Sequence, residues 1–192
     1  MVSLAEKMAA NLDMSAFGKA EELKKRLWFT ILALIVFRLG TFIPLPGIDP
    51  QILADIFSRN SNGILGMFNM FAGGALERMT IFALNIMPYI SASIILQLGQ
   101  SVIPSLSALK KEGEAGHRKI VHYTKVLTVL ITIIQGYGIA VGLEGMVGGA
   151  GVSAVVMPGF VFKFTTIVSL VGGTMFIVWL GDQITSRGVG NG

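Results

Sequence analysis

The chain has 192 residues, of which 53% are hydrophobic and 14% are charged, and its mean hydropathy is +0.71. Soluble domains carry roughly 25% charged residues, so this composition indicates a polytopic membrane protein. Cysteine is absent, which excludes disulfides, thiolate metal sites and a cysteine nucleophile, and a net charge of +4 is too weak a signal to predict nucleic-acid recognition.

The first 26 residues form a charged segment that lacks the apolar core of a signal peptide. Within it, residues 16–26 (AFGKAEELKKR) place Glu21 and Glu22 one turn before Lys25 and Arg26. This pattern predicts a short amphipathic helix on the cytoplasmic surface, or a plain charged lead-in to the first span. The N-terminus is expected to remain in the cytoplasm.

The first predicted span runs from about 27 to 44 (LWFTILALIVFRLGTFIP) and has Arg38 as its one charge. A charge inside a span costs several kcal/mol unless it is paired or snorkels, so Arg38 predicts an interior ion pair or a snorkelling side chain. Residues 64–72 (ILGMFNMFA) are apolar but fall short of the roughly 20 residues that a span needs. They predict a buried re-entrant piece or a surface helix.

The second predicted span, about 76–98, overlaps a stretch without any charge that runs from Met79 to Leu109. It differs from a simple membrane-anchoring helix, because Gly73 and Gly74 precede it and Pro88 interrupts it. Lipid would not tolerate the polar side chains in this span unless they faced protein or water. These polar residues are Asn85, Tyr89, Ser91, Ser93 and Gln97.

Ile86 and Ile90 stand four residues apart on one face of this span. They are either ordinary residues facing lipid or a neighbouring helix, or an aliphatic constriction in a water-filled passage. Apolar rings close pores by dewetting while polar walls stay wet, so the constriction also explains the polar neighbours.

A basic loop, 106–119 (LSALKKEGEAGHRK), leads to two further predicted spans at about 126–143 and 163–181. The loop is either a solvated turn that fixes the topology or a docking surface for an acidic cytoplasmic partner. Glycines in the two spans predict close helix packing. They are Gly136, Gly138 and Gly142 in the third span and Gly172 and Gly173 in the fourth.

The distribution of Lys and Arg predicts the orientation. Eleven of these cations fall on the side of the N-terminal tail, the 99–125 loop and Arg187, and three on the other side, namely Arg59, Arg78 and Lys163. The tail and the loop are therefore expected in the cytoplasm.

The sequence gives little support for catalytic activity. His117 and His122 have no intramembrane carboxylate partner, and no His, Asp and Glu cluster has metal-ligand spacing. We expect no enzyme activity, no cofactor and no metal. A secondary transporter also uses broken helices, but its usual intramembrane carboxylates are missing.

Four strings carry a more specific signal, and they occur in order over nearly the whole chain. They are FIPLPGID (42–49), MFNMFAGGALERMTIFALNIMPYISASIILQL (67–98), KKEGEAGHRKI (110–120) and WLGDQITSRGVGNG (179–192). They resemble the SecY family, the channel subunits of the bacterial protein-conducting translocon.

The resemblance implies an all-α polytopic bundle of four transmembrane helices plus a short re-entrant plug half-helix, the N-terminal part of an inverted-repeat channel of ten spans. It implies an amphipathic segment at 1–26 and the channel domain at 27–192. The implied roles are a pore ring of Ile86 and Ile90, a lateral gate at Ser91, a hinge at Gly73 and Gly74, a cytoplasmic partner contact at Lys110, Lys111, Arg118 and Lys119, and a plug formed by Ile64, Leu65, Gly66, Met67, Phe68, Asn69, Met70, Phe71 and Ala72.

The function that the resemblance implies is export of unfolded secretory polypeptides across the bacterial cytoplasmic (inner) membrane and insertion of membrane proteins into it. The implied partners are the SecE and SecG subunits, the SecA ATPase, the ribosome and its nascent chain, signal sequences and membrane lipids. Because family members have ten spans, the chain is expected to be an incomplete fragment that does not conduct alone. An alternative is a truncated nascent membrane protein caught as an insertion client.

Overall fold

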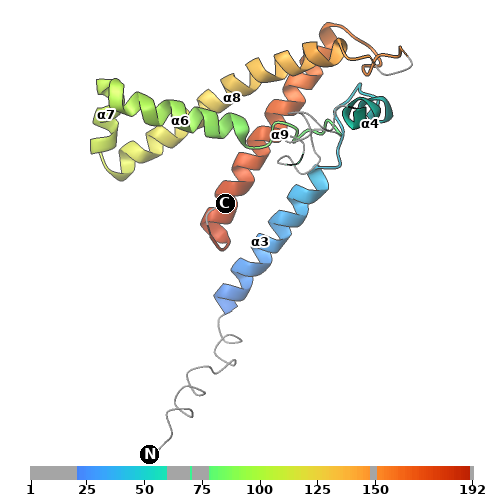
Figure 1. The fold of residues 1–192 in the computed structure, drawn as a ribbon. Helices are drawn as coiled ribbons and strands as arrows, with labels where there is room; N and C mark the ends of the chain where they lie inside the picture. The colour runs from blue at the N-terminus through green and yellow to red at the C-terminus, as the bar shows by residue number, and fades with distance from the viewer. Residues whose placement is uncertain (1–20, 60–69, 71–77, 148–150, 191–192) are drawn as a thin grey trace, which may run out of the picture. The chain divides into compact units, whose positions relative to one another are not determined.

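The computed structural model describes residues 21–59, 70, 78–147 and 151–190 of the chain. In these ranges the chain is helical, and only isolated β-bridges join its extended segments. The chain divides into two compact units, Phe37–Trp179 and Met1–Val36 with Leu180–Gly192. The helices in chain order are α3 (Glu21–Gly40), α4 (Pro50–Arg59), α6 (Met87–Val102), α7 (Pro104–Lys111), α8 (Glu114–Glu144) and α9 (Phe160–Arg187) (Figure 1).

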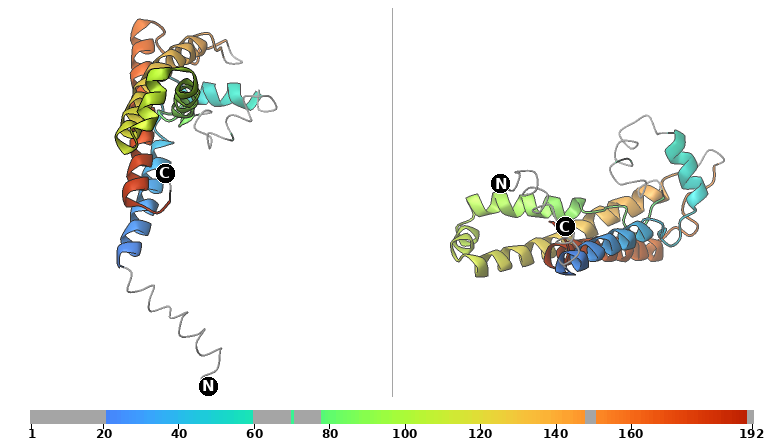
Figure 2. Two further views of the ribbon diagram at one scale, coloured as in Figure 1. Left: turned by 90° about the vertical axis from the view of Figure 1, so that its left-hand side faces the viewer. Right: turned by 90° about the horizontal axis from the view of Figure 1, so that it is seen from below.

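Helices α6, α7 and α8 form a hairpin within the larger unit. α6 and α8 lie side by side and run in opposite directions, and α7 joins them at one end (Figures 1 and 2). The bend between α6 and α7 is 97° and falls at Ile103, whose extended backbone is the conformation expected before Pro104. The predicted basic loop therefore consists of helix α7, a short turn at Gly113, and the first turn of α8.

Two helices, α8 and α9, are long and apolar enough to cross a membrane, and α6 with α7 is a third candidate if the bent pair is one span. The predicted third and fourth spans lie inside α8 and α9. Helix α3 covers most of the first predicted span, but it carries Lys24, Lys25 and Arg26 near its N-terminal end and is not among these candidates. The structure thus gives a multi-pass helical membrane protein without confirming the number of four spans.

Close packing between α8 and α9 occurs at Gly136. A methyl group placed there would lie 3.5 Å from Leu170 Cδ1 and 3.6 Å from Ile167 Cα, and Leu170 is fully buried. Gly138 and Gly142 do not provide such a contact, since no described atom lies within 4 Å of a methyl group built at either. Of the three glycines predicted to pack closely in this span, Gly136 is therefore the one that does so among the described residues.

Helix α8 also buries a row of three threonines at intervals of four residues. Each hydroxyl donates a hydrogen bond to the carbonyl four residues earlier in the same helix. Polar side chains can therefore lie in an apolar environment with their hydrogen-bonding capacity met locally. The three residues are Thr124, Thr128 and Thr132.

The short helix α4 was not predicted. The Asp49 carboxylate accepts hydrogen bonds from the backbone N–H groups of Gln51 (2.9 Å) and Ile52 (3.3 Å), so Asp49 caps the helix that begins at Pro50. Proline suits this first position because its missing N–H has no partner there anyway. Leu53 then packs into the core of the larger unit, where it is fully buried.

The connection between α8 and α9 is held by Glu144, the last residue of α8. One carboxylate oxygen accepts a hydrogen bond from Gly159 N–H at 2.8 Å, and the other lies 3.1 Å from Lys163 Nζ. Both side chains are mostly buried, which favours a persistent ion pair over a fluctuating surface contact. This pair links the end of one spanning helix to the first turn of the next.

In the smaller unit, α3 packs against the C-terminal end of α9. Thr30 Oγ1 accepts a hydrogen bond from Val189 N–H at 3.0 Å, and Ala33 is buried. The predicted pairing along the tail is found between Arg26 and Glu22, 3.0 Å apart, while residues 1–20 lie outside the described part.

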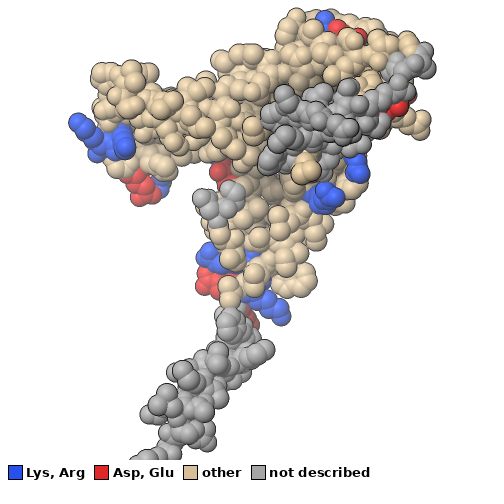
Figure 3. Space-filling view, viewed as in Figure 1, with Lys and Arg blue, Asp and Glu red and all other residues tan. Residues whose placement is uncertain are grey.

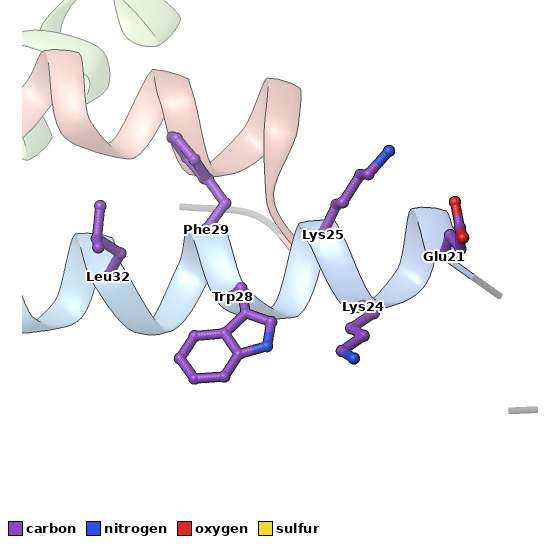
Figure 4. Close-up of a pocket in the computed structure, with 6 residues that line it drawn as sticks. All are labelled: Glu21, Lys24, Lys25, Trp28, Phe29 and Leu32. Atoms are coloured by element: carbon purple, nitrogen blue, oxygen red, sulfur yellow. The ribbon is translucent and has the colours of Figure 1, made fainter. Parts of the chain in front are cut away.

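A shallow surface hollow of about 600 Å³ on α3 has Trp28 and Lys24 on one side and Phe29 and Lys25 on the other (Figure 4).

Candidate functional site: the segment that leads into α6

The predicted second span does not begin as a helix. Residues 79–86 form successive turns, and Met79 and Asn85 adopt positive φ angles of 43° and 50°, which are incompatible with a continuing α-helix. Helix α6 starts at Met87, with Pro88 in its first turn. Pro88 therefore begins the helix and does not interrupt it, contrary to the sequence prediction.

The segment 79–86 is fixed by backbone hydrogen bonds to the chain that follows α3. Leu45 N–H donates to Met79 C=O at 2.9 Å, and Ile81 N–H donates to Ile43 C=O at 3.1 Å. Thr80 is completely buried between them. An irregular backbone at membrane depth requires such internal partners because lipid offers none.

Aromatic packing holds the same segment from both sides. The Phe82 ring stacks on Phe37 (centroids 5.8 Å apart, planes 3° apart) and on Phe176 of α9 (6.0 Å, 8°). Gly173 of α9 lies directly against the Ile81 carbonyl, where any side chain would collide with backbone. Of these residues only Gly173 was predicted from the sequence to pack closely. The stacked rings of Phe37, Phe82 and Phe176 were not predicted, because no local pattern indicates a contact between segments so far apart.

Ile86 and Ile90 lie at the start of α6, one turn apart. Ile86 precedes the first helical residue, and its carbonyl accepts the Ile90 N–H at 3.1 Å. Ile86 is partly buried, whereas 43% of Ile90 is exposed, and an exposed apolar row continues from it through Ile94 and Leu98. The predicted pair therefore lies at the N-terminal end of α6. Ile90 is the first residue of an apolar stripe on α6 that faces away from the rest of the larger unit.

The polar side chains of α6 line a different surface. Tyr89, Ser93 and Gln97, spaced by four residues, contribute to a cavity of about 400 Å³ between α6 and α8, which Lys110 of α7 and His117 of α8 also line. Gln97 Nε2 donates a hydrogen bond to Ser93 Oγ at 3.1 Å. Three of the predicted polar residues of this span thus meet a hollow inside the hairpin, which Leu96, Ile120 and Val121 also line.

The predicted partner-contact cations gather where α7 joins α8 (Figure 3). Arg118 pairs with Glu114 at 2.9 Å, and Lys119 pairs with Glu112 at 3.0 Å. Lys110 and Lys111 carry no carboxylate partner within the described residues. The end of the hairpin is therefore a charged, exposed surface with a cationic excess.

The remaining predicted site residues lie either on α6 or, for the most part, outside the described part of the chain. Ser91 lies on α6 and is partly buried. The plug residues Ile64 to Ala72, apart from Met70, and the hinge glycines Gly73 and Gly74 lie outside the described residues. In the described part of the chain, no cluster of His, Asp and Glu could hold a metal ion.

Comparison with known proteins identifies the family. The SecY family model matches residues 80–192. The chain is 59% identical over 178 residues to the protein translocase subunit SecY of Buchnera aphidicola subsp. Acyrthosiphon kondoi and 58% identical over 178 residues to that of Escherichia coli strain K12. Each match covers 93% of this chain, which spans 49% and 40% of those two proteins.

Solved structures agree at the level of the fold. Sec61 in the canine ribosome–channel complex from the endoplasmic reticulum superposes with a TM-score of 0.57 at 17% identity, over 88% of this chain and 34% of that one. A structure described as a protein conducting channel gives the same TM-score and identity. With the family model matching more than half of its length, this chain belongs to the SecY family.

Proposed function

We propose that the chain forms part of the wall and the constriction of a channel that exports unfolded polypeptides across the bacterial cytoplasmic membrane and inserts membrane proteins into it. Family membership supports this function, and one structural observation carries it. Ile86 and Ile90 stand one turn apart at the start of a helix whose preceding segment is irregular and firmly anchored. An aliphatic seal must keep a fixed position, and that anchoring would provide it.

The mechanism we propose is partition between water and lipid. A signal sequence or nascent span of about 20 apolar residues gains free energy on leaving water for lipid, whereas a polar chain does not. A constriction of apolar side chains would close around the passing chain, and the exposed stripe that begins at Ile90 would guide apolar segments toward a lateral gate at Ser91. The protein itself would perform no covalent chemistry.

The proposal includes the parts outside the described residues. Ile64 to Ala72 would form the plug that closes the channel from the outer side, and Gly73 and Gly74 would be its hinge. The excess of Lys and Arg on one side supports a cytoplasmic N-terminus and a cytoplasmic α7. Lys110, Lys111, Arg118 and Lys119 would then meet the partner that drives transport, SecA or a ribosome, in a complex with SecE and SecG.

Site-specific crosslinking from position 90 tests the proposal, using a chain of the family's full length that carries this sequence. A crosslink that forms only with a precursor arrested during export is the expected result, because Ile90 would then line the polypeptide path. Labelling by lipid alone would refute the pore role. As a second readout, Ile90→Asn should raise ion leak, while Ile95→Asn on the same helix serves as a matched control.

A further inference from the structure

Two arginines converge on one aromatic ring where α3 ends. The guanidinium carbon of Arg38, in the last turn of α3, lies 5.4 Å from the ring centroid of Phe42, and that of Arg78 lies 4.5 Å from it. Both distances are within the roughly 6 Å over which a cation is attracted by an aromatic face. For Arg38 the sequence predicted an interior ion pair or a snorkelling side chain; among the described residues its contact is with the Phe42 ring.

The charge of this cluster is not balanced within the described residues. Neither Arg38 nor Arg78 has a carboxylate partner there. Lys163, another cation predicted on this side of the membrane, does pair with an acid, Glu144. The attraction of an exposed cation to one aromatic ring is weak, so two guanidiniums that share the Phe42 ring without a carboxylate partner among the described residues favour binding of an anion.

The surroundings of the cluster are apolar and exposed. The exposed fractions are 64% for Leu39, 53% for Phe42 and 51% for Ile43. Free phosphate would be hydrated and would leave these side chains uncovered. A phospholipid satisfies both features, since its phosphate accepts paired hydrogen bonds from guanidinium groups and its acyl chains cover apolar side chains.

We propose that Arg38, Phe42 and Arg78 bind the phosphate headgroup of an anionic phospholipid on the outer side of the membrane. Arg38 lies in the last turn of α3, and both arginines are exposed, as Lys and Arg also are elsewhere on the face that Figure 3 draws. Long cationic side chains at a helix end reach the headgroup level of a membrane readily. The lipid would neutralise the arginines and hold the chain after α3 near the membrane surface. This proposal goes beyond the channel function and does not depend on it.

Native mass spectrometry of the chain, released from nanodiscs of equal phosphatidylglycerol and phosphatidylcholine, tests this site. We expect retained phosphatidylglycerol to bind about fivefold more weakly to Arg38→Gln and to Arg78→Gln, and about 25-fold more weakly to the double variant. Arg26→Gln is the matched control, because it removes the same charge from the other end of α3, where Arg26 already pairs with Glu22. Phe42→Leu should also weaken binding while leaving both charges.

Three results would overturn the proposal. Equal retention of the two lipids would show that charge does not select the occupant. Retention unchanged in the double variant, with helicity by circular dichroism intact, would place the lipid elsewhere. Displacement by millimolar inorganic phosphate would make the occupant a free anion, because a lipid held also by its acyl chains should stay bound.

Discussion

Replacement of Gly173 by alanine tests whether α9 holds the segment that leads into α6. A methyl group at this position would lie 2.8 Å from the carbonyl carbon of Ile81 and 3.2 Å from Phe82 Cδ1, with the Ile81 oxygen nearer still. Ordinary contact begins at 3.4 Å, so the two backbones must separate by about 0.6 Å or more. Overpacking of this kind costs about 1–3 kcal/mol, and here the obstacle is backbone, which cannot rotate away.

Gly172→Ala is the matched control, since no described atom lies within 4 Å of a methyl group built there. It should stabilise the protein by about 0.5–1 kcal/mol, because alanine favours the helix over glycine. Unfolding by sodium dodecyl sulfate in dodecyl maltoside micelles, followed by circular dichroism, measures both changes. The two substitutions should act in opposite directions.

Equal stability of the two variants would refute the contact between Gly173 and Ile81. The substitution should also affect the seal, because Ile81 precedes Ile86 by only five residues and the intervening turns transmit the displacement. In a chain of full family length, Gly173→Ala should raise ion leak and Gly172→Ala should not. A loss of stability without an increase in ion leak would support the contact between Gly173 and Ile81, but it would show that this contact does not control the constriction.

Two further predictions concern the larger unit. Leu170→Ala should lower the free energy of unfolding by about 2–5 kcal/mol, since it empties a fully buried site against Gly136, and the same detergent titration measures the loss; a loss below about 1 kcal/mol would contradict this packing. Asp49→Ala should cost about 1 kcal/mol and increase amide hydrogen exchange at Gln51 and Ile52, whereas Asp49→Asn should retain most of the protection; equal exchange in both variants would exclude the cap.

The third and fourth spans could be predicted because long runs without charge leave few other structures. Their helices extend beyond the apolar runs, as α8 does by beginning at Glu114, since a helix needs no lipid to continue. The start of α6 could not be predicted in this way. Its position depends on hydrogen bonds to Ile43 and Leu45, residues more than 30 positions away, and hydropathy does not report such contacts.

The candidate site was predicted in part. Ile86 and Ile90 were expected on one face of a continuous helix; in the structure Ile86 is the residue before α6, and its carbonyl accepts the hydrogen bond of Ile90 N–H in the first turn. The role of that pair stays a prediction. The contact of Arg38 and Arg78 with Phe42 was missed, since the two arginines are 40 positions apart in the sequence. Asp49 followed by Pro50, the first residue of α4, is a capping signal that the sequence does contain.

The threonine row of α8 has a consequence for how the spanning helices are aligned. The hydroxyl groups of Thr124, Thr128 and Thr132 donate their hydrogen bonds within α8, so they donate none to a neighbouring helix that would fix α8 lengthwise. This face of α8 therefore does not itself oppose movement of the helix along its axis. The alignment of α8 with α9 is instead set at two places, the contacts of Glu144 with Gly159 and Lys163 at one end and the close packing of Gly136 against Ile167 and Leu170 further along, so any small shear movement has to preserve both.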